Sequence, residues 1–114
     1  MTRKILRSIS AAAILAAVAA FGHPPSEIKL NYDATSRTLQ ATVLHDTKKT
    51  DEHFIEIIQV RINGKDMVKQ SFLKQTDSQK RTVLFLLEDV KTNDQISVTG
   101  VCNVFGKKTE TLKL

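Results

Sequence analysis

The residues of this sequence with the clearest capacity for chemistry are its three histidines and its single cysteine. His23, His45, His53 and Cys102 lie at the ends of β-rich runs or in loops beside them. Imidazole nitrogens and a thiolate sulfur form a competent ligand set for iron, zinc or copper. Each residue also has a plainer interpretation: a surface or capping imidazole for the histidines, and a small buried hydrophobic side chain for the cysteine. Sequence spacing alone leaves this choice open.

The apolar period of the neighbouring strands predicts where two of these side chains point. In residues 38–44 apolar residues alternate with polar ones, and His45 continues the apolar phase; Cys102 ends residues 95–102 in the same way. Residues two apart lie on the same face of a strand, so both side chains should point toward the core at a strand's end. His53 opens the longest predicted strand. A β-sandwich gathers its strand ends at two poles, so one pole can collect the four side chains.

Seven short runs rich in β-formers follow one another along the chain, and no sustained apolar stripe of helical period lies among them. They cover residues 27–32, 38–44, 54–63, 67–73, 81–87, 95–102 and 108–114. Short strands separated by turns about every 8–12 residues are typical of β-sandwiches. The sequence therefore predicts an all-β fold, an immunoglobulin-like antiparallel β-sandwich of about seven strands.

Three local features refine this prediction. Asn63-Gly64 is a two-residue hairpin signal between two of the runs. Ile57 and Ile58 are adjacent apolar residues that interrupt the alternation, which a β-bulge or burial of both faces at that point would explain. Residues 81–87 are apolar enough to be a central strand.

The N-terminal segment has the pattern of a cleavable signal peptide. Three basic residues lie within the first seven, and residues 9–21 are uncharged and rich in alanine. We therefore predict a signal peptide over residues 1–22, a single domain over residues 23–114, and a periplasmic or secreted protein. Cleavage after Gly22 would leave His23 at the new N-terminus; cleavage two or three residues earlier is an alternative.

Composition excludes several functional classes. The whole chain has 17 basic and 12 acidic residues, a net charge of +5. Three of the basic residues belong to the predicted signal peptide, so the remainder has 14 against 12, or +2, which gives no argument for nucleic acid. The four glycines form no phosphate-binding loop. We expect no membrane span after cleavage, and a single cysteine provides no disulfide framework.

Cys102–Gly106 reads Cys-Asn-Val-Phe-Gly and resembles the Cys-Asn-x-His-Gly motif of the superoxide reductases, whose iron module is shared with desulfoferrodoxin. His45 followed by His53-Phe54-Ile55 is similar to that family's His-Pro-Met…His-Tyr-Ile segment. His23, which is followed by two prolines, resembles its early His-x-Pro. The matches occur in the same order along residues 23–114, and the family's fold is a seven-stranded immunoglobulin-like sandwich.

This resemblance implies a mononuclear non-haem iron with His23, His45 and His53 as equatorial ligands and Cys102 as the axial thiolate. It implies one-electron reduction of superoxide to hydrogen peroxide, with an electron-donor protein as partner. Phe105 stands where the family has its fourth histidine, and phenylalanine cannot ligate a metal. The free α-amine of His23 would supply a replacement nitrogen if cleavage falls after Gly22.

The family also carries a lysine that attracts the superoxide anion, within a Glu-Lys pair before its first histidine, and this chain lacks that pair. Lys48 and Lys49, in the loop between two predicted ligands, are candidates for the same electrostatic role. They also have the simpler interpretation of solvated loop charges. Oligomeric state is left open by the sequence.

A second resemblance points to a different class of function. His53-Phe54-Ile55 together with Asn63-Gly64-Lys65 is similar to a segment of the Z subunit of thiosulfate-oxidising carrier complexes, also a small immunoglobulin-like sandwich. That resemblance implies a metal-free module that binds a carrier subunit. An exported sandwich domain that binds a partner by its edges or loops is the third alternative.

Overall fold

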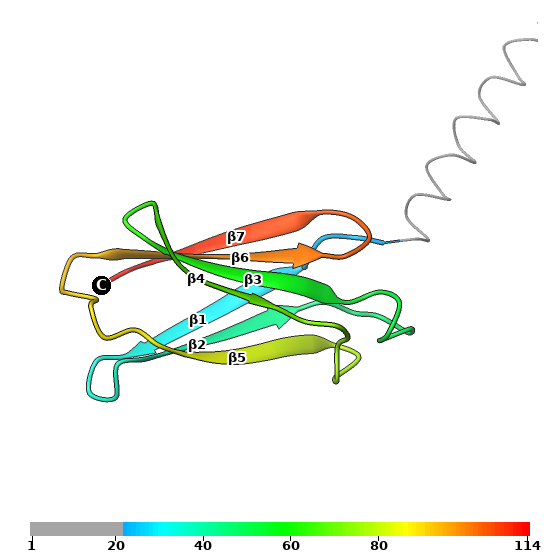
Figure 1. The fold of residues 1–114 in the computed structure, drawn as a ribbon, viewed down its shortest axis with the longest axis horizontal. Coiled ribbons are helices and arrows are strands. Elements are labelled where there is room, and N and C mark those ends of the chain that lie inside the picture. Colours follow the sequence, from blue (N-terminus) through cyan, green and yellow to red (C-terminus); the bar gives the residue numbers. More distant parts are fainter. Residues whose placement is uncertain (1–21) are drawn as a thin grey trace, which may run out of the picture.

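Seven antiparallel strands in two sheets make up the computed structural model, which describes residues 22–114. One sheet has three strands in the order β1-β2-β5 and the other has four in the order β4-β3-β6-β7, stacked as two layers (Figure 1). This confirms the predicted all-β antiparallel sandwich. The strands are β1 (Glu27–Asp33), β2 (Thr38–Leu44), β3 (Ile55–Ile62), β4 (Lys65–Ser71), β5 (Lys80–Leu86), β6 (Gln95–Cys102) and β7 (Lys107–Lys113).

The core lies between the two sheets and follows from the alternation of each strand. Every second residue of β2 is fully buried, and β6 contributes Ile96 and Val98 from the facing sheet. Leu39, Ala41 and Val43 thus pack against the opposite layer while their polar neighbours face outward. Burial of these apolar side chains is the main force that holds the layers together, at about 25 cal/mol per Å² removed from water.

The two predicted irregularities of β3 are both present. The pairing of β3 with β6 shifts register between Ile55 and Ile57, so a bulge lies where the alternation breaks. At the other end of β3, Asn63 and Gly64 connect it to β4 with φ angles of 52° and 81°. Positive φ at both central residues is the signature of a type I′ hairpin turn.

The prediction that residues 81–87 form a central strand is wrong. β5 lies at the edge of the three-stranded sheet, where only β2 pairs with it. Its apolar appearance comes from Leu84 and Leu86 on the outer face, each 64% exposed, and from inward-facing Val83 and Phe85. An apolar run on both faces therefore reflects an exposed apolar surface rather than burial on both sides.

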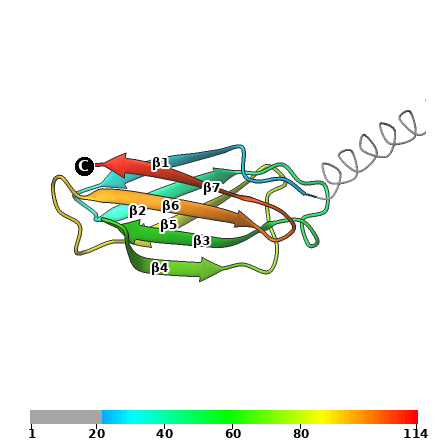
Figure 2. The same ribbon diagram turned by 90° about the horizontal axis from the view of Figure 1, so that it is seen from above.

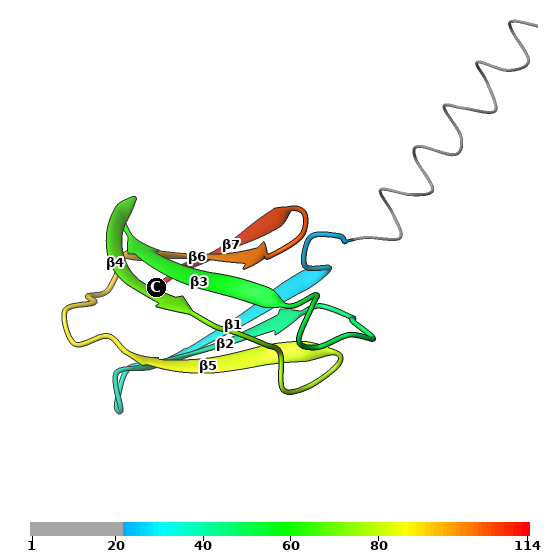
Figure 3. The same ribbon diagram turned by 45° about the vertical axis from the view of Figure 1, so that its right-hand side comes forward.

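The order of the strands collects four chain segments at one pole of the sandwich. Successive strands run in opposite directions, so the loops that follow β2, β4 and β6 emerge at the pole where the chain enters β1 (Figures 1 and 2). The C-terminus and the β1–β2 and β5–β6 connections lie at the other pole, as the turned view in Figure 3 also shows. We call the pole where the chain enters β1 the histidine pole, because it carries His23, His45 and His53.

The predicted signal peptide lies, apart from Gly22, outside the described residues. Within residues 22–114 no helix is long and apolar enough to span a membrane. Localisation therefore stays a prediction from the sequence.

Candidate metal site

Three imidazoles converge at the histidine pole. The ring centroids of His23 and His45 are 4.7 Å apart, those of His23 and His53 4.9 Å, and those of His45 and His53 4.6 Å. One nitrogen from each ring can be chosen so that all three lie within 4.8 Å of one another. Metal–nitrogen bonds of about 2.0–2.1 Å place two nitrogens of one site about 3–4 Å apart, so the cluster needs only a small contraction to hold a metal ion.

Two of the rings come from the two ends of the β2–β3 loop and the third from the segment before β1, and the fold brings them together. His45 follows β2 and is fully buried, as its place in the inward phase predicts. Its backbone N–H donates to the carbonyl of Gln79, 2.8 Å away, which fixes the end of β2. His53 lies near the end of the β2–β3 loop, where its N–H donates to the Lys49 carbonyl at 2.8 Å. His23 comes from the segment before β1.

Close backbone packing holds that N-terminal segment against the β6–β7 loop. A side chain added at Gly22 would approach the Val104 Cβ to 2.7 Å, and one at Gly106 would approach Pro24 to 2.8 Å. Gly106 also has a φ of 88°, a conformation that glycine adopts without strain. The glycine of the Cys102–Gly106 segment is therefore required locally, because it lets the two segments approach and places His23 over the cluster.

Gln75, in the loop between β4 and β5, fixes the orientation of the His45 ring. It is fully buried, and its Oε1 lies 2.9 Å from Nδ1 of His45 and accepts from the Ile55 N–H at 3.2 Å. Its Nε2 donates to the carbonyls of His45 at 2.7 Å and Asp77 at 2.9 Å. Sequence reasoning missed this residue, because a glutamine in a polar loop carries no signal of burial.

His53 contributes a buried nitrogen that has no hydrogen-bond partner within the described residues. This atom is Nε2, on a ring that lies edge-on to both other imidazoles. An unpaired buried polar atom is costly in a native structure, and an unplaced ion is one of its ordinary explanations. Burial lowers the pKa of His53, and repulsion from His45 and then His23 lowers it further. The ring therefore favours the neutral form that binds metals.

The other two rings are held by hydrogen bonds. Burial lowers the pKa of His45, although its hydrogen bond with Gln75 opposes this change. Nδ1 of His23 lies 3.0 Å from the Pro24 carbonyl oxygen, and Nε2 lies 2.9 Å from that of Asp46. A neutral imidazole can donate to only one of these oxygens, so its other nitrogen carries a lone pair. In its neutral form each of these two rings thus has one lone-pair nitrogen, which lies beside an acceptor oxygen in this structure.

Cys102 lies at the same pole but is not one of the donors in the three-imidazole group. It ends β6 opposite Ile55, and 4% of its surface is exposed. Its Sγ accepts a hydrogen bond from the Val104 N–H, with 3.4 Å between nitrogen and sulfur. Its own N–H donates to the Gly106 carbonyl at 3.0 Å, which closes the turn. Hydrogen bonds to sulfur of this kind tune metal–sulfur centres where a metal is bound.

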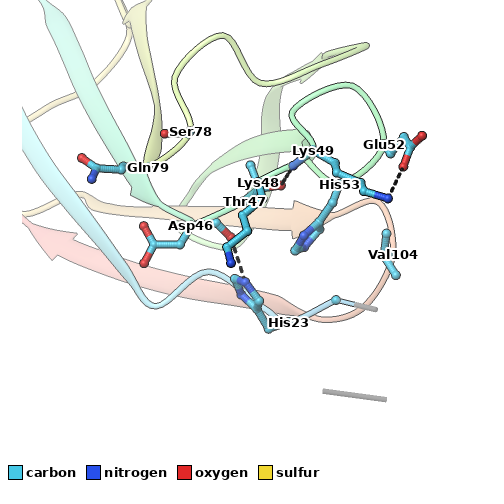
Figure 4. A pocket seen from close by; sticks show the side chains of 11 residues that line it. His23, Asp46, Thr47, Lys48, Lys49, Glu52, His53, Ser78, Gln79 and Val104 are labelled. Carbon is cyan, nitrogen blue, oxygen red and sulfur yellow. Dashed lines mark hydrogen bonds and ion pairs between the residues drawn. The ribbon is translucent and has the colours of Figure 1, made fainter. Parts of the chain in front are cut away.

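An open pocket of about 780 Å³ leads to the cluster and is lined by His23, His53, Lys48 and Lys49 among other residues (Figure 4). Both lysines are exposed, and the ammonium group of Lys49 lies 3.6 Å from a carboxylate oxygen of Glu52. The structure thus brings the two predicted lysines beside two of the three histidines. The carboxylates of Asp46 and Glu52 line the same pocket.

Phe105 supplies no ligand and does not fill the cluster. It lies in the β6–β7 loop with 55% of its surface exposed, next to Val104, which is 45% exposed and lines the same pocket. The described residues therefore offer three imidazoles where the resemblance implies four.

Comparison with known protein families finds no family that matches this chain, and no curated protein matches its sequence. Membership of the superoxide reductases, like the likeness to the Z subunit, therefore stays a prediction. What the structure establishes is a cluster of three histidines that can hold a metal ion.

Proposed function

We propose that this protein binds a mononuclear non-haem iron through His23, His45 and His53, with Cys102 as a thiolate ligand, and that it reduces superoxide to hydrogen peroxide. The observation that carries the metal site is the group of three imidazole nitrogens within 4.8 Å of one another. The choice of iron and of superoxide rests on the resemblance of Cys102–Gly106 and of the ordered histidines to superoxide reductases.

The donor set fits a transition metal. Nε2 of His53 is buried without a partner, and the burial of His45 and His53 favours their neutral, metal-binding forms. Cys102 is the free thiol of residues 22–114 and ends on the pole that carries the rings. Its N–H···S bond from Val104 supports a role as a thiolate. If the chain begins at His23, the α-amine of this residue is the fourth nitrogen that Phe105 does not provide.

Iron bound here would supply one electron to superoxide, which also takes up two protons to become hydrogen peroxide. An external electron-donor protein restores the reduced state. The role of Lys48 and Lys49 is to attract the anion toward the mouth of the pocket. Replacing both with methionine should slow the reaction at low ionic strength, and the difference should shrink as salt screens the charges.

The test is anaerobic loading with ferrous iron followed by oxidation. We expect one iron per chain and a blue colour, which marks a thiolate bonded to ferric iron. Cys102→Ser should abolish the colour while the strands and the imidazole cluster remain, because serine retains an acceptor for the Val104 N–H. A matched control is Ser97→Ala on the outer face of β6, which should leave both iron content and colour unchanged.

Three outcomes separate the parts of the proposal. Stoichiometric iron without the blue colour would remove Cys102 from the ligand set and keep the imidazole site. A blue protein that does not react with superoxide would retain the site and reject the activity. A colourless protein with no stoichiometric metal would overturn the proposal and favour the metal-free partner module.

A further inference from the structure

The side chain of Gln75 makes four polar contacts, and together they fix which end of the amide is oxygen. Its Nε2 faces the carbonyl oxygens of His45 and Asp77, which only accept hydrogen bonds. Its Oε1 faces the N–H of Ile55, which only donates. Exchanging the two ends would place acceptor against acceptor twice and donor against donor once. The oxygen of this buried amide therefore faces Nδ1 of His45.

An amide oxygen can only accept, and it lies 2.9 Å from Nδ1, closer than the acceptor beside Nε2, so this contact favours the proton of neutral His45 on Nδ1. Its Nε2 then carries a lone pair, and this nitrogen lies 3.2 Å from the carbonyl oxygen of His23, which is also an acceptor. Two acceptors this close are stabilised by a cation beside them. The other tautomer would donate from Nε2 to the His23 carbonyl, but it would set the bare Nδ1 against the closer Gln75 oxygen, so the network disfavours it.

We propose that Gln75 is the positioning residue of the site, which holds His45 as the Nδ1–H tautomer and directs its Nε2 toward the metal. This inference rests on the proposed metal-binding function. Metal-ligating histidines commonly donate their other ring N–H to a neighbouring acceptor, and loss of that acceptor lowers metal affinity by about 10–100-fold. Gln75 also bonds the end of β2 and the first residue of β3, so it links the segments that carry His45 and His53.

The tautomer is read directly in the metal-free protein by nitrogen-detected NMR of the imidazole rings at about pH 8, where histidine is neutral. We expect His45 to be protonated at Nδ1 in the wild type. Gln75→Met preserves the length of the side chain but removes the acceptor, so the ring should change to the Nε2–H form. Gln75→Glu retains an acceptor but loses both amide donors, so it should lower stability and yet keep the Nδ1–H form.

Affinity for Zn²⁺ alone, measured by calorimetry, gives the second readout. We expect Gln75→Met to weaken binding about 10–100-fold, Gln75→Glu to stay within a few-fold of wild type, and Gln70→Met on exposed β4 to change nothing. A wild-type His45 protonated at Nε2 would overturn the inference, as would equal affinities of wild type and Gln75→Met. If Gln75→Met does not fold, the tautomers of wild type and Gln75→Glu decide.

The tautomer also separates this inference from the function on which it rests. A wild-type protein with the Nδ1–H form that binds no Zn²⁺ would confirm that Gln75 orients His45 and would overturn the metal site. Tight Zn²⁺ binding with an Nε2–H tautomer in the metal-free protein would support the metal site and overturn the role of Gln75.

Discussion

The side chain of Asn103 holds the backbone on both sides of His53. Its Oδ1 accepts from the Phe54 N–H at 2.8 Å, and its Nδ2 donates to the Glu52 carbonyl at 2.9 Å. The backbone N–H of Asn103 also donates to the Phe54 carbonyl at 3.0 Å. Asn103, the residue after Cys102, thus fixes the position of the predicted metal ligand His53 in the β2–β3 loop. The asparagine of the Cys-Asn pair therefore has a structural role.

Asn103→Ala should loosen His53 and weaken metal binding. Two hydrogen bonds to backbone groups are lost, so we expect a fall of about 1–3 kcal/mol in the free energy of unfolding. Chemical denaturation measures that change, and calorimetric titration with Zn²⁺ should show lower affinity. Asn63→Ala is the matched control, because Asn63 makes a similar pair of bonds at the opposite pole, to Asp94 and Gln95. It should lower stability without changing affinity, and equal losses of affinity in both variants would contradict this role of Asn103.

The metal-free protein should lose stability as the pH falls below about 6.5. His45 and His53 have pKa values below the ordinary 6.5 in the folded state, so the unfolded chain binds protons first. The stability that the two neutral rings contribute is fully present above about pH 6.5. It is lost as the pH falls toward the pKa values of the two histidines in the folded state. The loss is at most about 1.4 kcal/mol per pH unit for each histidine. Thermal or urea unfolding between about pH 5 and 8 measures it.

The His53→Gln variant is the control for this pH dependence. Its stability should change less steeply over the same range, because one of the two shifted groups is gone. Asp94 also has a lowered pKa, through its hydrogen bonds with the Asn63 side chain and the Lys91 N–H. It changes stability only at pH values below 3.8, its ordinary pKa, which is outside this pH range. Equal slopes for wild type and His53→Gln, or greater stability in acid, would show that these rings do not resist protonation in the fold.

The sequence predicts those parts of the site that local strand periodicity determines. It does not predict the parts that depend on contacts between distant segments. His45 lies on the inward phase of β2, so its burial follows from alternation alone. The common pole follows from antiparallel strand order. Gln75 could not be found this way, because its partners lie 20 and 30 residues away in the chain. The edge position of β5 was missed because Leu84 and Leu86 are apolar without being buried.

Phe105→His should strengthen metal binding. The phenylalanine is 55% exposed, so its removal changes stability little, within about 0.5 kcal/mol. An imidazole in the β6–β7 loop adds the nitrogen that the superoxide reductase motif carries at this position, so affinity for iron should rise. Phe105→Ala removes the ring without adding a ligand and should leave affinity unchanged. If Phe105→His alters neither the affinity nor the spectrum of the iron-loaded protein, Phe105 does not correspond to the family's fourth histidine.

The α-amine of His23 provides a different way to complete the site, and the length of the N-terminus tests it. In a chain that begins at His23, the α-amine and the ring of one residue can bind the same ion. His23 lines the pocket beside the cluster, with Gly22 next to it. A chain that begins at Gly22 converts this amine into an amide, which does not ligate in the same way. We therefore expect the chain beginning at His23 to bind ferrous iron more tightly.

The pH dependence of this difference identifies the amine. An α-amine loses its proton near pH 7.7–8.0, so the advantage of the chain beginning at His23 should grow as the pH rises from about 6.5 to 8.5. The chain beginning at Gly22 carries its α-amine one residue farther from the His23 ring, so its affinity should depend less on pH over this range. Identical affinities for the two chains across this range would exclude the amine as a ligand and leave the three imidazoles, with or without Cys102, as the complete set of protein donors.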